Sequence, residues 1–176
     1  MQKDQHFMRD AETIRKIVVL ADIGSNEKVI EIGAGRGALT KELAKSARRV
    51  IAIELDSTLK PVLEKKLGSI GNVSILIKNA LKADLSADKI VGNIPYAICE
   101  PLLRKLPMYE FKKAVLTVSK SFAYRLLAKP GEKNHSELSD FAQKKFKILI
   151  EMELEKGVFE PRPGTNSVVI SVYRKQ

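Results

Sequence analysis

The chain has 176 residues, of which 44% are hydrophobic, and its 31 Lys and Arg outnumber 21 Asp and Glu for a formal net charge of +10. This fits one globular domain, with no apolar run near the roughly 20 residues that cross a membrane. Cys99 is the only cysteine and there are 2 histidines, which excludes an internal disulfide and a Cys/His zinc cluster and suits the cytoplasm. The charge favours a nucleic-acid partner, with plain solubility as the alternative.

Apolar runs of strand length alternate with helical stretches along the chain. Strands are predicted at 28–33, 50–54, 73–77, 89–91 and 114–118. Helices are predicted at 38–47, 57–68, 98–106, 120–128 and 136–146, with Ser57 as the cap of the second. Two closing strands, 147–153 and 167–173, are expected to join the sheet as an antiparallel pair. The alternation predicts βαβ units and a doubly wound, mostly parallel sheet in a single domain.

A glycine-rich turn joins the first predicted strand to its helix. Gly33, Gly35 and Gly37 follow Glu31, and glycines let a backbone approach a ligand while a helix N-terminus offers free N–H groups. Glu54 ends the second strand, where a carboxylate can accept hydrogen bonds from both hydroxyls of a ribose. The pattern predicts a nucleoside cofactor and leaves NAD and S-adenosylmethionine both open. A tight turn without a ligand is the plain alternative.

The third predicted strand ends at Asn79 and Ala80. The carboxyl ends of strands line the ligand crevice of a doubly wound sheet, so Asn79 is placed to hydrogen-bond the edge of a cofactor's adenine. An ordinary polar cap at the end of a strand explains Asn79 equally well.

The tetrapeptide Asn93-Ile94-Pro95-Tyr96 follows the fourth predicted strand and favours one cofactor. An aromatic amine is a poor nucleophile, because its lone pair is delocalised into the ring. Acceptors on its hydrogens, from the Asn93 side chain and the Ile94 carbonyl, localise that lone pair toward a methyl donor. Pro95 fixes the backbone that carries these acceptors, and Tyr96 offers a flat face on which a base can stack. The segment therefore indicates methylation of a base amine, with S-adenosylmethionine as donor.

With these motifs in place, the chain resembles the ribosomal RNA adenine dimethyltransferase family, in which KsgA-type enzymes act on the small subunit and Erm-type enzymes on the large. The likeness covers nearly the whole chain. It implies a Rossmann-like class I S-adenosylmethionine-dependent methyltransferase fold, α/β, with a seven-stranded sheet whose last strand is antiparallel. The residues that carry it are 5–8, 31–37, Glu54, 93–96, 125–131, 159–163 and 167–169.

The resemblance also implies roles for individual residues. The N-terminal segment of the family closes over the cofactor, which implies contacts from Gln5, His6 and Met8, with Met8 in place of the usual leucine. Tyr96 and Phe159 are implied to hold the target adenine between them once it is flipped out of the RNA. The other implied cofactor contacts are Gly33, Gly35, Glu54, Leu55, Asn79, Ala80 and Asn93.

Segments 101–103 and 128–131 resemble the small-subunit branch, in its archaeal and eukaryotic members. That branch dimethylates two adjacent adenosines of a 3′-terminal hairpin, which implies ribosomal RNA or a small-subunit precursor as partner, S-adenosylhomocysteine as product, a monomer and no metal. Asn79 replaces a usual Asp, segment 163–167 lacks a usual Lys and Asp, and the family's helical C-terminal domain is expected to be absent from residues 1–176.

Three other functions compete with this interpretation. An Erm-type or other nucleic-acid adenine methyltransferase would use the same motifs on a different RNA. A binding module would keep the fold and the RNA surface as an assembly or transcription factor, without the chemistry. A dinucleotide oxidoreductase is least favoured, because it leaves Asn93 to Tyr96 unexplained.

Overall fold

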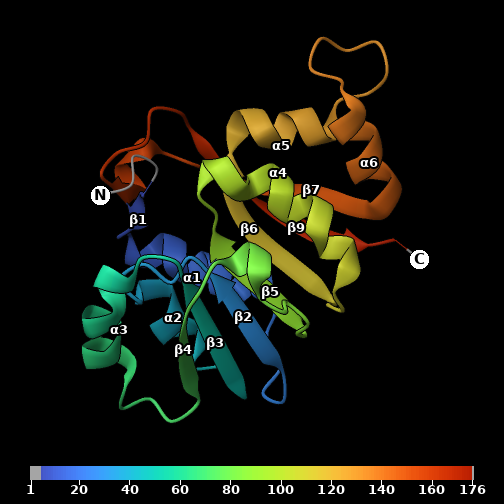
Figure 1. The fold of residues 1–176 in the computed structure, drawn as a ribbon. Coiled ribbons are helices and arrows are strands. Elements are labelled where there is room, and N and C mark those ends of the chain that lie inside the picture. Colours follow the sequence, from blue (N-terminus) through green and yellow to red (C-terminus); the bar gives the residue numbers. More distant parts are fainter. Residues whose placement is uncertain (1–4, 176) are drawn as a thin grey trace.

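A seven-stranded sheet runs through the computed structural model, which describes residues 5–175 (Figure 1). Its strand order is β4-β3-β2-β5-β6-β9-β7. The first five strands of this order are parallel, and β9 runs antiparallel to both β6 and β7. The strands are β2 (Lys28–Ile32), β3 (Arg49–Glu54), β4 (Val73–Ile77), β5 (Lys89–Asn93), β6 (Lys113–Ser119), β7 (Phe146–Leu154) and β9 (Ser167–Arg174). The predicted doubly wound sheet with an antiparallel last strand is confirmed.

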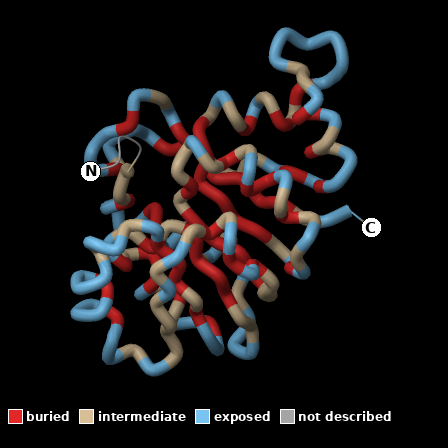
Figure 2. The backbone as a smooth tube through the Cα atoms, viewed as in Figure 1, coloured by how far each residue is buried: buried red, intermediate tan, exposed pale blue. Residues whose placement is uncertain are grey.

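Helices cover both faces of the sheet, because successive residues of each buried strand point to opposite sides. Val29 of β2 packs with α1 and α2, and the next residue, Ile30, packs in the larger core with α4, α5 and α6. A third apolar cluster joins α3 to β3 and β4. Figure 2 shows that buried residues run along the strands. The helices are α1 (Ala11–Ala21), α2 (Ala38–Leu43), α3 (Lys60–Leu67), α4 (Cys99–Lys105), α5 (Lys120–Leu127) and α6 (Glu137–Lys145).

Several predicted boundaries were wrong. Helix α2 ends at Leu43, although Ala47 beyond it is still buried, and α4 is flanked by short 3₁₀ turns. Ser57 does not cap the third helix: the Asp56 carboxylate accepts from the Thr58 N–H at 2.9 Å and begins a 3₁₀ turn, Ser57–Leu59, ahead of α3. A carboxylate at the helix start also interacts favourably with the helix dipole, which explains why Asp56 is preferred.

Three elements of the structure, α1, β1 and β8, lay outside the predictions. Helix α1 packs on the sheet through Ile14 and Ile17 and is capped by Asp10, whose carboxylate accepts from the Thr13 N–H at 2.7 Å. Near the N-terminus, β1 (Phe7–Met8) pairs antiparallel with β8 (Phe159–Glu160) in a separate two-stranded sheet. Within residues 5–175, no helix is long and apolar enough to span a membrane.

Candidate active site

A cavity of about 700 Å³ lies at the carboxyl ends of β2, β3, β4 and β5, where the strand order reverses. Doubly wound sheets bind their ligands at this position, and small-molecule sites typically measure roughly 300–1,000 Å³. The structure brings every predicted site residue to this one cavity, including those from the two chain ends. Its lining includes Gln5, His6, Met8, Gly33, Gly35, Glu54, Leu55, Asn79, Ala80, Asn93, Ile94, Pro95, Tyr96 and Phe159.

The glycine turn after β2 forms one wall of the cavity. Gly33 has a φ of +80° and Gly35 a φ of +55°, a region that side chains with a Cβ rarely adopt. A Cβ at Gly33 would lie 3.1 Å from the Asn93 carbonyl oxygen, and one at Gly35 would lie 2.9 Å from the Phe7 ring. Glycine is therefore required here for both backbone conformation and close approach.

The Glu54 carboxylate is held at the end of β3 by backbone N–H groups. One oxygen accepts from the Gly35 N–H at 2.8 Å, and the other accepts from Leu55 at 2.8 Å and Asp56 at 2.9 Å. Glu54 is buried, yet it lines the cavity. Because a carboxylate offers about four lone-pair sites and three are used, this anchored group can still accept a hydrogen bond from a ligand hydroxyl.

Asn79 both caps a turn and lines the cavity, the two positions that the sequence allowed for it. Its side-chain oxygen accepts from the Leu81 N–H at 2.9 Å and caps the 3₁₀ turn Ala80–Lys82, as an ordinary polar cap does. Asn79 and Ala80 also line the cavity beside the end of β4. The capping bond fixes the side chain, so its amide group has a set orientation toward any ligand.

Asn93 is the last residue of β5, and its side chain is oriented by the N-terminal segment. Its Nδ2 donates to the His6 carbonyl oxygen at 2.6 Å, which leaves Oδ1 as the free acceptor end of the amide. Ile94 is buried and its N–H donates to the Thr117 carbonyl at 3.0 Å, so the following backbone is tied to β6. The predicted acceptor pair is thus held by contacts from both sides.

Tyr96 ends this loop, and its ring is held by a hydrogen bond and lies beside a second ring. Its hydroxyl forms a 2.8 Å hydrogen bond with Ser167 Oγ, at the start of β9. The His6 ring lies beside it, with ring centroids 6.0 Å apart and planes inclined by 39°. Tyr96 therefore has a defined orientation where it lines the cavity.

The pairing of β1 with β8 covers the cavity, and sequence reasoning missed it. Phe7 lies opposite Glu160 and Met8 opposite Phe159. His6 Nδ1 is 2.9 Å from the Pro161 carbonyl, Arg9 forms an ion pair with Glu160, and the Arg36 guanidinium lies 4.9 Å from the Phe7 ring centroid. Phe159 is buried in the core with Met8, only 4% exposed, and lines the cavity. The N-terminal segment and the loop after β7 thus form one cover.

Glu31 is a buried carboxyl group at the base of the cavity, 1% exposed. Burial, reinforced by the nearby Glu54 carboxylate and opposed by Thr40, raises the pKa of Glu31 to about 8. Within residues 5–175, its Oε2 has no hydrogen-bond partner. Glu31 is therefore mostly protonated at neutral pH, a property that its place in the glycine motif did not reveal.

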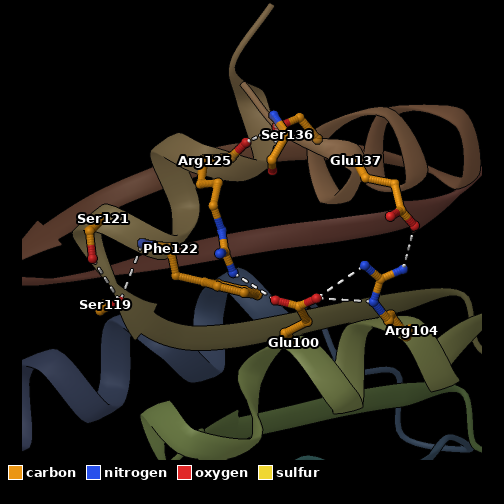
Figure 3. A network of polar contacts seen from close by, with 9 residues as sticks. Glu100, Arg104, Ser119, Ser121, Phe122, Arg125, Ser136 and Glu137 are labelled. Atoms are coloured by element: carbon orange, nitrogen blue, oxygen red, sulfur yellow. Dashed lines mark hydrogen bonds and ion pairs between the residues drawn. The ribbon is translucent and has the colours of Figure 1, made fainter. Parts of the chain in front are cut away.

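A polar network steadies the helix that follows the Asn93–Tyr96 loop (Figure 3). Glu100, in the first turn of α4, pairs with Arg104 at 3.0 Å and with Arg125 of α5 at 2.8 Å. Arg104 also pairs with Glu137 of α6 at 3.7 Å. The Glu100 carboxylate, in the first turn of α4, interacts favourably with the helix dipole and with both guanidinium groups. The network joins the three helices on this face of the sheet.

Cys99 begins α4 and is buried, as expected of a small apolar residue. Burial raises the pKa of its thiol to about 12, so it is protonated at neutral pH and is a poor nucleophile. In the described part of the chain, no group of three or more His, Cys, Asp or Glu side chains is placed to hold a metal ion.

Residues 1–176 match the family described as ribosomal RNA adenine dimethylase. The chain belongs to this family. The ribosomal RNA small subunit methyltransferase A of Thermotoga neapolitana is 39% identical over 97% of this chain and 66% of its own length. A probable ribosomal RNA small subunit methyltransferase A from Thermococcus sibiricus is 41% identical over 94% of this chain and 61% of its own length.

Solved structures agree with this membership. A dimethyladenosine transferase from Plasmodium falciparum has a TM-score of 0.90 at 32% identity, covering 97% of this chain and 64% of that one. The 23S rRNA methyltransferase ErmE has a TM-score of 0.86 at 28% identity, covering 96% of this chain and 70% of that one. The chain spans a little under two thirds of the length of the curated relatives cited above.

Proposed function

We propose that this chain is an S-adenosylmethionine-dependent methyltransferase that dimethylates the 6-amino group of adenosines in small-subunit ribosomal RNA. The observation that carries the proposal is the orientation of Asn93. Its side chain donates to the His6 carbonyl at 2.6 Å, so its oxygen is the end left to accept from an amine in the cavity. Family membership and the names of the relatives support the RNA substrate.

The cavity fits the cofactor in size and in lining. The glycine turn permits close approach, the anchored Glu54 carboxylate would accept from a ribose hydroxyl, and Asn79 with Ala80 would border the adenine. Leu55, beside Glu54, and the covering residues Gln5, His6 and Met8 would complete the enclosure. When bound, S-adenosylmethionine supplies an electrophilic methyl group and leaves as S-adenosylhomocysteine.

The protein's part in the chemistry is to prepare the adenine nitrogen. Asn93 Oδ1 and the Ile94 carbonyl would accept the two amine hydrogens, which draws the nitrogen out of conjugation and aims its lone pair at the methyl group. Pro95 and the Ile94–Thr117 hydrogen bond of 3.0 Å hold this acceptor pair in place before the reaction. Acceptors that are already positioned need no reorganisation as positive charge develops on nitrogen.

Proton release follows nitrogen–carbon bond formation. The methylated amine is cationic at that moment and strongly acidic, so it loses its proton to water and no strong base is required. A neutral carboxamide at Asn93 suits this order of events. A second turnover on the same nitrogen adds the second methyl group, with the one remaining hydrogen still held by an acceptor.

The aromatic residues would hold the flipped base. Tyr96, fixed by its 2.8 Å hydrogen bond to Ser167, presents a face for stacking, which is worth about 1–3 kcal/mol per base. Phe159 of β8 also lines the cavity and would border the other side of the base. Because Phe159 is buried against Met8, full contact with a base requires the cover to shift.

The finer substrate assignment is part of the proposal: two adjacent adenosines of the 3′-terminal hairpin, methylated by a cytoplasmic monomer that needs no metal. Similarity to ErmE keeps large-subunit RNA as the second candidate. The test is transfer of labelled methyl from S-adenosylmethionine to unmethylated small-subunit and large-subunit RNA, with the modified nucleoside identified. Dimethyladenosine in small-subunit RNA supports the proposal. Label in large-subunit RNA alone favours the second candidate, and binding without transfer favours an assembly factor.

A further inference from the structure

A second, open hollow of about 530 Å³ lies next to the active site, between the start of α5 and the loop after β7. We call it the lysine groove. Figure 1 shows α5 and this loop along the same edge of the molecule. The lysine groove is lined by Lys120, Ser121, Tyr124, Asn134, Lys156, Gly164, Thr165 and Asn166.

One loop forms a wall of both hollows. Residues 159 and 160 line the active-site cavity, and residues 164–166, a few positions further on, line the lysine groove. The next residue, Ser167, bonds the Tyr96 hydroxyl at 2.8 Å, and the Lys120 N–H donates to the Asn166 carbonyl at 2.9 Å. The groove therefore lies on the side of the active site that carries Tyr96, where the target base would stack.

The chemistry of the lysine groove suits a polyanion. Its described lining carries two lysines and several amide and hydroxyl groups, but no carboxylate. Lys156 Nζ donates to the Gly164 carbonyl at 2.7 Å. Because a carbonyl is neutral, this hydrogen bond does not neutralise the positive charge of Lys156. Lys120 Nζ contacts both carboxylate oxygens of Glu153 on β7, at 2.7 and 2.8 Å, and this partly exposed pair leaves the ammonium one further hydrogen.

An aromatic ring lies among these cations. Tyr124 is 46% exposed, and Lys120 Nζ lies 5.6 Å from its ring centroid. Exposed aromatic rings next to cations are the usual surface on which single-stranded nucleic acid stacks its bases. Neither a metal ion nor an apolar peptide would use this combination of lysines, amides and one flat ring.

We propose that the lysine groove binds the RNA strand directly adjoining the target adenosine, with phosphates at Lys120 and Lys156 and a neighbouring base on Tyr124. The inference rests on the proposed function, since it takes the target base to enter beside Tyr96. A flipped nucleotide stays bonded to its neighbours through phosphates, so the strand must leave the cavity along the surface. The groove is a lysine-bearing surface on the Tyr96 side of the cavity, where such a strand would leave.

The experiment compares two double variants that remove the same charge. Lys120→Ala/Lys156→Ala empties the groove of cations. Lys144→Ala/Lys147→Ala removes two exposed lysines near the opposite end of β7, roughly 20 Å away along the strand. The RNA is an unmethylated hairpin with two adjacent adenosines in its loop. Its affinity is measured from 0.1 to 1 M salt, with S-adenosylmethionine affinity and thermal unfolding as checks on folding.

Each phosphate contact contributes about 0.7–0.9 to the slope of log affinity against log salt. Each therefore strengthens binding about five- to eightfold at 0.1 M relative to 1 M salt. We expect the groove variant to lose about 1.5 from the slope and on the order of 25- to 60-fold in affinity at 0.1 M. The control should change the slope by less than about 0.3, because its distance exceeds the screening length.

The outcomes separate this inference from the proposed function. Equal slopes and affinities for the two double variants overturn the groove assignment, even where the wild-type chain methylates RNA. A slope loss confined to the groove variant supports it, even where the wild-type chain binds RNA without methylating it. A defect seen only with assembled ribosomal particles, and not with bare RNA, assigns the groove to a protein contact and overturns the proposal. Absence of RNA binding by the wild-type chain overturns both.

Discussion

The buried carboxyl group of Glu31 is predicted to make the stability of the fold depend on pH. The substitution is Glu31→Gln, which keeps the shape of the side chain and removes its ionisation. Burial raises the Glu31 pKa from 4.5 to about 8. Below pH 4.5 the group is protonated in both folded and unfolded chains, and above about 8 it is ionised in both. Between these limits only the unfolded chain releases the proton, so stability falls as the pH rises.

The size of this effect follows from the shift. Each unit of pKa shift is worth about 1.4 kcal/mol, so the shift of about 3.5 units limits the total loss of unfolding free energy to about 5 kcal/mol. Most of this total, about 3.5 kcal/mol, falls between pH 5 and 8. We expect a measured loss there of about 2–3.5 kcal/mol, because the polar cavity next to Glu31 lowers the penalty of ionisation. The glutamine variant carries no charge at either pH and should lose none of this free energy.

The assay is urea unfolding of the native chain and of Glu31→Gln at several pH values from 5 to 8.5. Glu155→Gln, at an exposed position, is the matched control and should follow the native curve. The native free energy of unfolding should fall toward alkaline pH, and that of Glu31→Gln should stay nearly level. Parallel pH curves for the native chain and Glu31→Gln would refute the reasoning, because they would show that Glu31 ionises normally in the folded state.

Other substitutions test the rest of the site. Asn93→Ala should leave folding intact and slow methyl transfer on the order of 10²–10³-fold, the usual cost of losing one preorganised hydrogen-bonding group; near-normal turnover contradicts the acceptor role. Tyr96→Ala should weaken RNA binding about 5- to 150-fold through lost stacking while cofactor affinity changes little, and equal losses in both argue against stacking. Gly35→Ala should weaken cofactor binding, because φ is +55° and the new Cβ would lie 2.9 Å from an aromatic ring, whereas Gly71→Ala, with open space around it, should not. Cys99 should react with a thiol reagent at pH 8 only after unfolding, since burial raises its pKa to about 12; fast labelling of the native chain contradicts this.

Most of the fold could be predicted because its strands are buried on both faces. Such strands form continuous apolar runs, and Val29 and Ile30 illustrate how both sides of β2 enter a core. Helix α1 also had a signal that went unused: Asp10 as cap and apolar residues at Ile14 and Ile17. Strands β1 and β8 have two residues each, too few for any periodicity. Their pairing depends on contacts between distant parts of the chain.

That the proposed site residues would meet in one cavity was predictable for a related reason. Gly33, Glu54, Asn79 and Asn93 all stand at the ends of parallel strands, and the order of those strands brings the ends together. The sequence could not supply the hydrogen-bond partners. That His6 would offer its backbone carbonyl to the Asn93 amide is a long-range contact that no local pattern encodes.

The hydrogen bond from Asn93 to His6 also explains why an amide suits this position better than a carboxylate. A carboxylate has no N–H to donate, so it would face the His6 carbonyl with two acceptors in contact at 2.6 Å. Because β1 pairs with β8, the strand that follows His6 is tied to the strand that carries Phe159. A single cover therefore orients the residue that would accept the target amine, borders the place of the cofactor and limits access to the base-binding side. Displacement of one strand of this pair must disturb all three.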